Sequence, residues 1–138
     1  VYKRQQMVRS LAAADLAALC RQLTSFFASI PYTMRRKDTE QERERYFHYT
    51  FYLIFRILST YLVLTEKQQS EGRADCIIET PKDIFIFEFK LDGTANEALR
   101  QIESRGYARP YEADMRHIYL VGASFSSKTG TIEEWKVK

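Results

Sequence analysis

The sequence predicts one α/β domain in which a mixed β-sheet is flanked by helices. Two observations support this fold class: apolar residues change between helical and strand spacing along the chain, and a turn-prone segment joins two strongly apolar strands. The 138 residues are 45% apolar and 14% aromatic, which is enough for a single domain with a substantial core. The expected core order is helix, strand, strand, strand, helix and strand, with an extra helix at the amino terminus.

Residues 10–30 are predicted to form the extra amino-terminal helix. Their large apolar residues recur at alternating spacings of three and four, as on one face of a helix, and Pro31 ends the pattern. The residues of this apolar stripe are Leu16, Leu19, Leu23, Phe26 and Ile30. We expect the stripe to pack on the remainder of the domain.

A second helix is expected over residues 46–60. Almost every face of this helix would be apolar, so we expect it to be buried on most sides. Glu44 and His48, four residues apart, share one face near its start. Glu44 also fits a solvated residue favoured by the helix dipole, and His48 fits an ordinary, partly buried histidine. Residues 61–65 supply the first strand.

The second and third strands are predicted to form a β-hairpin around residues 80–83 (Thr-Pro-Lys-Asp). When the turn is centred on the second and third of these residues, Asp75 lies directly opposite Glu88. The same register places Arg73 opposite Lys90. Cross-strand partners share a face of the sheet, with Cβ atoms ~5 Å apart. The other face is wholly apolar, as a buried sheet requires, and consists of Ala74, Cys76, Ile78, Phe85, Phe87 and Phe89.

The pairing of Asp75 with Glu88 predicts a binding site for a divalent cation. Two carboxylates held ~5 Å apart repel each other, so folding alone would not select them, whereas a bound ion turns the repulsion into chelation. Lys90, two residues beyond Glu88, points the same way and can orient a water molecule or offset the charge of a phosphate group. The alternative is a solvated hairpin end that carries an ordinary Glu–Lys pair.

A third helix is predicted over residues 94–105. It opens with a capping-box pattern of Thr94 and Glu97, and Gly106, with Pro110 nearby, ends it. Gln101 lies on the flank of this helix, whose amino end closely follows the hairpin. Two further strands complete the sheet, at residues 117–123 and 131–137.

The order of Asp75 and then Glu-Phe-Lys at residues 88–90 resembles the signature of the PD-(D/E)xK nuclease superfamily. The wider sequence is similar to the nuclease-like domain that follows an AAA-ATPase-like domain in many gut-bacterial proteins. One departure is Ala74, where the family has a proline, although that proline is often absent in this superfamily. The segments that carry the resemblance are, in order, 29–31 (Ser-Ile-Pro), Glu44 with His48, 72–75 (Gly-Arg-Ala-Asp), 86–92 (Ile-Phe-Glu-Phe-Lys-Leu-Asp), 98–102 (Ala-Leu-Arg-Gln-Ile), Tyr107 and 121–125 (Val-Gly-Ala-Ser-Phe).

The resemblance implies a restriction-endonuclease-like core and metal-dependent hydrolysis of phosphodiester bonds in nucleic acid, with DNA as the expected substrate. It implies that Asp75 and Glu88 bind Mg²⁺ or Mn²⁺, with Glu44 as an added or indirect ligand. Lys90 would position the attacking water, and Gln101 would help to hold that water or a phosphate oxygen. The residues expected to contact the substrate are Arg73, Tyr107 and His48.

Other interpretations remain open on the sequence alone. Gln101 also fits a solvated helix residue, and Tyr107 fits a residue at the edge of the core. The domain could instead be a non-catalytic module that binds nucleic acid or a protein partner and serves an upstream ATPase-like domain of the same protein. The intact trio of Asp75, Glu88 and Lys90 favours the enzyme.

Charge and cysteine content constrain the partners and the compartment. The net charge of +3 permits nucleic acid as a partner without demanding it. Cys20 and Cys76 both lie among apolar residues, as expected of small core side chains in a reducing cytoplasm. No apolar stretch is long enough to span a membrane and no secretory signal is visible, so we expect a cytoplasmic protein.

The first residues have a separate interpretation. The chain begins without a methionine, and residues 1–5 (Val-Tyr-Lys-Arg-Gln) resemble the translation of a transposon-end sequencing adapter. We therefore expect residues 1–9 to be adapter-derived or unstructured and residues 10–138 to form the nuclease-like domain. On this interpretation an ATPase-like region precedes the domain in the natural protein.

Overall fold

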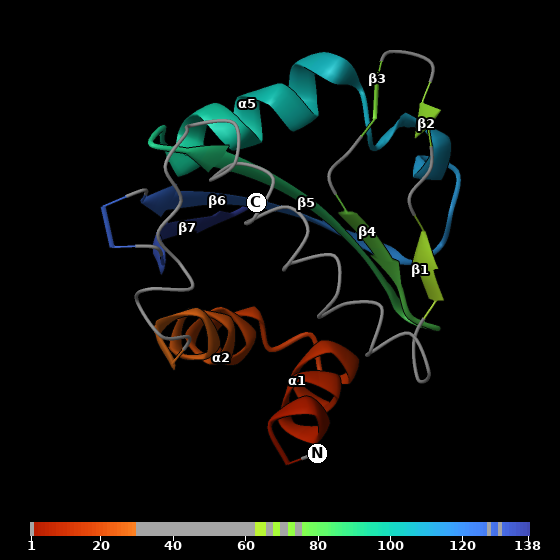
Figure 1. The fold of residues 1–138 in the computed structure, drawn as a ribbon. Helices are drawn as coiled ribbons and strands as arrows, with labels where there is room; N and C mark the ends of the chain where they lie inside the picture. The colour runs from red at the N-terminus through yellow and green to blue at the C-terminus, as the bar shows by residue number, and fades with distance from the viewer. Residues whose placement is uncertain are drawn as a thin grey trace.

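A five-stranded mixed β-sheet separates helix α5 (Ala95–Arg105) from helices α1 (Tyr2–Ala12) and α2 (Leu16–Ser29) in the computed structural model (Figure 1). The structure describes residues 2–29, 63–65, 68–69, 72–73, 76–126, 128–129 and 131–138, so the predicted helix over residues 46–60 lies outside it. The strands, in spatial order, are β1 (Val63–Thr65), β4 (Cys76–Glu79), β5 (Asp83–Leu91), β6 (His117–Ser126) and β7 (Thr131–Val137). β5 and β6 run parallel and the other neighbours run antiparallel, which confirms the predicted fold class.

The hairpin of β4 and β5 forms in the predicted register. Cys76 pairs with Phe87, as a turn centred on residues 81–82 requires. At the base of this turn the Thr80 amide donates to the Asp83 carbonyl oxygen over 2.9 Å, and the Thr80 hydroxyl accepts from the Asp83 amide over 3.0 Å. Because these groups satisfy one another, the turn itself fixes the register of the two strands.

The predicted register does not extend to Arg73. β3 (Gly72–Arg73) pairs instead with β2 (Gln68–Gln69) in a separate two-stranded sheet. Only two residues connect β2 to β3, and such short connections favour a local hairpin. Arg73 and Lys90 thus lie in two different sheets. The predicted cross-strand pairing of Arg73 with Lys90 is therefore wrong.

The central strand β5 is apolar on both faces from Ile84 to Phe87. Its face toward α1 and α2 belongs to a buried cluster that includes Phe85, Phe87, Val121 and Phe125. Its face toward α5 belongs to a second buried cluster that includes Ile77, Ile84, Ile86, Ile102 and Tyr107. Side chains two residues apart on a strand share a face, so Glu88 and Lys90 lie on the α5 face.

The predicted amino-terminal helix is two helices rather than one. Residues 13–15 separate α1 from α2, and Ala14 there has a φ of 53°. The Asp15 carboxylate then accepts from the Ala18 amide over 3.1 Å, which satisfies one of the free amides at the start of α2. Of the predicted stripe, Leu16, Leu19 and Leu23 are buried, Phe26 is partly buried, and Ile30 lies outside the described residues.

Residues 2–9 are folded, so of the two expectations for residues 1–9 only their origin from an adapter stays a prediction. They form most of α1, and Met7 is buried in the same core cluster as Leu11 and Leu19. Met7 and Leu11 are four residues apart, so they lie on one face of the helix. This apolar pair is the reason that the first residues pack onto the sheet.

Both cysteines are buried core residues, as the sequence predicts. Cys76 lies in the cluster beneath α1 and α2, and Cys20 is buried on α2. Burial raises the pKa of the Cys20 thiol to about 12, so this thiol stays protonated and unreactive at neutral pH.

Helix α5 begins and ends as the sequence predicts. The Thr94 hydroxyl accepts from the Glu97 amide over 3.0 Å, and Gly106 ends the helix in the left-handed conformation with a φ of 66°. A short 3₁₀ helix (Arg109–Tyr111) then leads back toward β6. None of the helices in the described part of the chain is long and apolar enough to cross a membrane.

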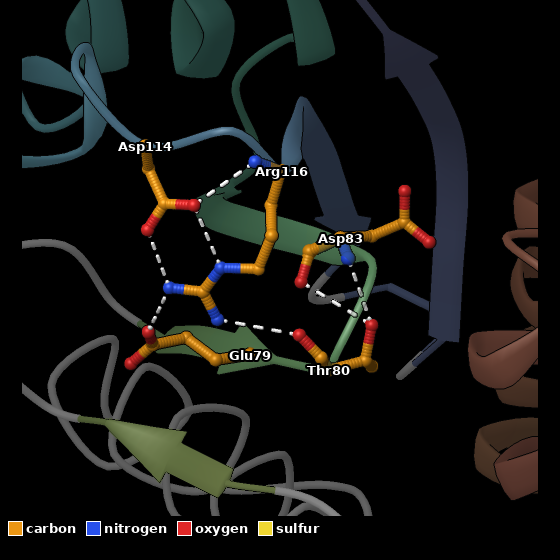
Figure 2. A network of polar contacts seen from close by, with 5 residues as sticks. All are labelled: Glu79, Thr80, Asp83, Asp114 and Arg116. Carbon is orange, nitrogen blue, oxygen red and sulfur yellow. Dashed lines mark hydrogen bonds and ion pairs between the residues drawn. The ribbon is translucent and has the colours of Figure 1, made fainter.

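A charged cluster holds the turn end of the hairpin against the segment that enters β6 (Figure 2). The Arg116 guanidinium donates to Asp114 Oδ2 over 2.7 Å and to Glu79 Oε1 over 2.8 Å. It also donates to the Thr80 carbonyl oxygen over 3.2 Å. Hydrogen bonds from the side chain and the backbone of Arg116 lower the pKa of the Asp114 carboxyl to about 2. The cluster therefore braces the end of the sheet that lies opposite the carboxyl end of β5.

Candidate active site

Glu88 is a buried carboxylate at the carboxyl end of the central strand β5. It is 4% exposed, and it follows Ile84 and Ile86 on the face toward α5. Removing a carboxylate from water is costly unless hydrogen bonds replace the lost hydration. The side-chain amide of Gln101 on α5 donates to Glu88 Oε1 over 2.6 Å. A neighbouring helix thus helps to hold this carboxylate in place.

Gln101 connects Glu88 to Lys90. Its amide oxygen accepts a hydrogen bond from the Lys90 ammonium group, while its amide nitrogen donates to Glu88. An ammonium group has only donors and a carboxylate has only acceptors, so a single orientation of the amide satisfies both neighbours. These three residues are called the Glu88–Gln101–Lys90 network below.

A glycine beside Glu88 allows α5 to come close enough for this contact. Glu88 is paired with Gly122 on β6. A Cβ atom added at Gly122 would lie 2.4 Å from the Ala95 carbonyl oxygen and 3.1 Å from the Ala98 Cβ atom, both on α5. The first distance is too short for any side chain to be tolerated without movement of the helix. Gly122 therefore sets how closely the helix that carries Gln101 lies on the sheet.

The loop between β5 and α5 is fixed to β6. The Ser124 hydroxyl donates to the Gly93 carbonyl oxygen over 2.7 Å, and the Asp92 amide donates to the Phe125 carbonyl oxygen over 2.8 Å. Asp92 has a φ of 56°, a conformation that costs energy for a residue with a side chain. The strand and the helix of the network are thus joined by a short, hydrogen-bonded connection.

The structure brings together three of the residues predicted for the site, namely Glu88, Lys90 and Gln101. Asp75, Glu44 and His48 lie outside the described residues, and only the backbone of Arg73 is described. Within the described ranges, no group of three or more His, Cys, Asp and Glu side chains is placed to hold a metal ion. A metal site formed by Asp75 and Glu88 therefore stays a prediction.

Tyr107 lies inside the core. It is buried beside Ile102 and Tyr111 in the apolar cluster under α5. Tyr107 was expected at the edge of the core and lies deeper than that, and its contact with a substrate stays a prediction.

The chemistry of the network suits a site for a cation and an anionic substrate. Glu88 supplies hard carboxylate oxygens, which are the ligands that Mg²⁺ and Mn²⁺ prefer, so this part of the donor set fits such an ion. Lys90 supplies a compact positive charge two residues away. Gln101 fixes both side chains without adding a charge of its own.

Two residues that shape the site were missed by reasoning from the sequence: Gly122 and Ser124. The signal for Gly122 was present, since an isolated glycine in an apolar strand indicates close approach of another backbone. Ser124 gave no signal, because its hydrogen bond to Gly93 joins residues 31 positions apart.

Comparison with known proteins places the chain in a family. The model of the PD-(D/E)XK nuclease superfamily matches residues 42–135. An uncharacterized protein in the vnfD 5′ region of Azotobacter chroococcum mcd 1 is 33% identical over 129 residues, which are 92% of this chain. The chain spans only 25% of the length of that relative. No solved structure matches the chain significantly. The chain belongs to the PD-(D/E)XK nuclease superfamily.

Proposed function

We propose that the domain hydrolyses phosphodiester bonds in nucleic acid, with DNA as the substrate and Mg²⁺ or Mn²⁺ as the cofactor. The observation that carries this proposal is the Glu88–Gln101–Lys90 network at the carboxyl end of β5. A glutamate is rarely buried unless it is paired or has a role that offsets its cost. The superfamily generally hydrolyses phosphodiester bonds, which is the chemistry that such a network suits.

In this proposal Asp75 and Glu88 hold the cation, and Glu44 is an added or indirect ligand. The register of the hairpin supports the pairing, since it is described as far as Cys76 opposite Phe87, the positions next to Asp75 and Glu88. Carboxylate oxygens are the ligands that Mg²⁺ prefers in proteins. When it is bound, the cation supplies Lewis-acid chemistry that stabilises charge on the scissile phosphate.

Lys90 positions the attacking water and offsets negative charge on the phosphate. The Gln101 amide holds the Lys90 ammonium group beside the Glu88 carboxylate, so both groups are in place before a substrate binds. Gln101 also helps to hold the water or a phosphate oxygen. The residues proposed to contact the substrate are Arg73, His48 and Tyr107.

A second candidate function is a non-catalytic module that binds nucleic acid or a protein partner. In this case the domain would serve an upstream AAA-ATPase-like domain of the same protein. The length of the curated relative, of which this chain spans a quarter, favours a larger natural protein with further domains. For either function we propose a cytoplasmic location.

Replacing Lys90 with methionine separates the two functions. Methionine resembles the lysine stem but lacks the ammonium group, so Lys90→Met should bind metal normally and lose roughly 10²–10⁴-fold in kcat. Mn²⁺ binding is measured by calorimetry, and cleavage is measured on labelled single- and double-stranded DNA and RNA. Lys82→Met is the matched control, because Lys82 is exposed at the turn at the other end of β5.

Three results would change this assignment. Unchanged cleavage by Lys90→Met would refute the catalytic role of Lys90. A raised KM with an unchanged kcat would show that Lys90 binds the substrate without contributing to the chemical step. If the wild-type chain and the longer natural protein both fail to cleave any nucleic acid with any divalent metal, the binding module is favoured.

A further inference from the structure

Strand β7 carries an irregularity beside the candidate site. Its pairing with β6 skips Glu133, which makes this residue a β-bulge. Ile132 and Trp135 are three residues apart, yet both pack against the core beneath α1 and α2. A regular strand would send them to opposite faces. The bulge therefore turns Glu134 toward the face that carries α5.

The Glu134 carboxylate contacts the first residue of α5. It accepts a hydrogen bond from the Ala95 amide over 2.9 Å. This amide is one of those that the geometry of a helix leaves without a partner inside the helix, and a negative charge at this end is favoured by the helix dipole. On the other face of the sheet, the Trp135 indole donates to the Thr24 hydroxyl of α2 over 3.0 Å. Adjacent residues of β7 thus hold helices on opposite sides of the sheet.

The contact from Glu134 affects where α5 lies more than whether it forms. Thr94 already caps the helix through the Glu97 amide, which is a local contact. The bond from Glu134 instead joins residues 39 positions apart. At the other end of α5, Lys138 and Glu103 form an ion pair at 2.5 Å, but both side chains are exposed and such pairs contribute little. Glu134 is exposed as well, but it binds the backbone amide of the buried Ala95, so its bond holds the backbone of α5 directly.

The anchored residue also makes the close contact with β6. Ala95 is fully buried, and its carbonyl oxygen is the atom that leaves no room for a side chain at Gly122. Its amide is bound by β7 and its carbonyl group lies against β6, so the first turn of α5 is held from two strands. Gln101 lies six residues further along the same helix, a distance of about 9 Å. A shift of the first turn therefore shifts Gln101 relative to Glu88.

We propose that Glu134 is a positioning residue, which fixes the first turn of α5 on the sheet and thereby places the Gln101 amide between Glu88 and Lys90. The kinetic consequence of this inference rests on the proposed nuclease function. Its structural consequence, the position of the Gln101 amide, does not depend on that function.

The structural consequence is tested by NMR of the Gln101 side-chain amide, identified as the pair of signals missing from Gln101→Leu. In Glu134→Ala these protons should shift and exchange with solvent at least tenfold faster, because the bond to Glu88 is weakened. Glu133→Ala is the matched control, since the exposed neighbour should leave the signals unchanged. Glu134→Gln should restore most of the wild-type behaviour, because its amide oxygen can accept the same bond from Ala95.

The kinetic consequence is tested on the same variants. Glu134→Ala should lose roughly 10²-fold in kcat, as expected of a misplacement of about 1 Å, and Glu134→Gln should recover most of it. If neither the wild-type chain nor the longer natural protein cleaves nucleic acid, the proposed function fails and the NMR result alone decides the role of Glu134.

Wild-type Gln101 signals in a folded Glu134→Ala would overturn the inference. If Glu134→Ala does not fold, Glu134→Asp is measured in the same way, since it keeps the carboxylate on a shorter stem. Gln101 signals that stay at their wild-type positions in Glu134→Asp would then overturn it, and displaced signals would support it.

Discussion

Replacing Gly122 with alanine tests whether the close contact between α5 and β6 holds the site together. The new Cβ atom would lie 2.4 Å from the Ala95 carbonyl oxygen, whereas ordinary contact begins at 3.4 Å. The blocking atom belongs to the backbone, so the helix must move away from the sheet by roughly 1 Å. The same movement would lengthen the 2.6 Å bond from Gln101 Nε2 to Glu88 Oε1 to about 3.6 Å, beyond hydrogen-bonding range.

Both stability and activity should fall in Gly122→Ala. Overpacking of this kind lowers the free energy of unfolding by about 1–3 kcal/mol. For a domain of this size that corresponds to a decrease in Tm of roughly 3–12 °C. The loss of alignment should lower kcat roughly 10²-fold. Thermal unfolding followed by circular dichroism measures the first effect, and single-turnover cleavage measures the second.

Val121→Ala provides the control for general destabilisation. Val121 precedes Gly122 on β6 but is buried on the face toward α1 and α2, so its truncation lowers stability without moving α5. Its kcat should stay within about twofold of wild type. A Tm for Gly122→Ala equal to that of wild type would refute the close approach of α5. A destabilised but fully active Gly122→Ala would show that the site does not depend on this approach.

Two further predictions concern charged groups. Asp75→Asn should raise the Tm of the metal-free protein slightly, because it removes the repulsion between two carboxylates. It should also abolish the Tm increase that Mg²⁺ or Mn²⁺ produces in wild type. Equal metal-induced increases in Tm in both proteins would show that the ion binds elsewhere. Asp114→Asn should lower Tm at neutral pH, because Arg116 hydrogen bonds lower the pKa of Asp114 in the folded state from 3.8 to about 2. Its stabilisation is present above pH 3.8 and is lost as the pH falls toward 2, so the Tm difference between wild type and Asp114→Asn should shrink over that interval. A Tm difference that stays constant there would contradict the assignment.

The part of the site that the sequence could predict is encoded locally. The hairpin register follows from the turn at residues 80–83, whose own hydrogen bonds fix the alignment of the two strands. Glu88, Lys90 and Gln101 all lie in one strand and the helix that follows it. Alternation along the strand placed Glu88 and Lys90 on one face, and the capping pattern placed the start of the helix, whereas the approach of Gln101 to the site was implied by the family resemblance.

The remainder depends on contacts between segments that are distant in sequence. Gly122 on β6 and Glu134 on β7 both contact α5, and no local sequence pattern indicates which helix will pack against a given strand. The predicted pairing of Arg73 with Lys90 was wrong for a different reason. The short connection between β2 and β3 favours a local hairpin, and this hairpin competes with an extension of the β4–β5 hairpin as far as Arg73. The roles of Asp75 and Glu44 stay predictions, because both residues lie outside the described part of the chain.

The burial of α1 changes where this domain can be cut to give a working fragment. The family model matches residues 42–135, yet Met7 and Leu19 cover the face of the sheet that contains Phe85 and Phe87. A fragment limited to the matched residues would lack both helices, so the apolar side chains that α1 and α2 cover on that face would lose this cover. Monomeric proteins rarely expose a large apolar patch, because such a patch promotes aggregation. Expression boundaries for this domain should therefore follow the packing of α1 and α2, which lie outside the segment that sequence similarity defines.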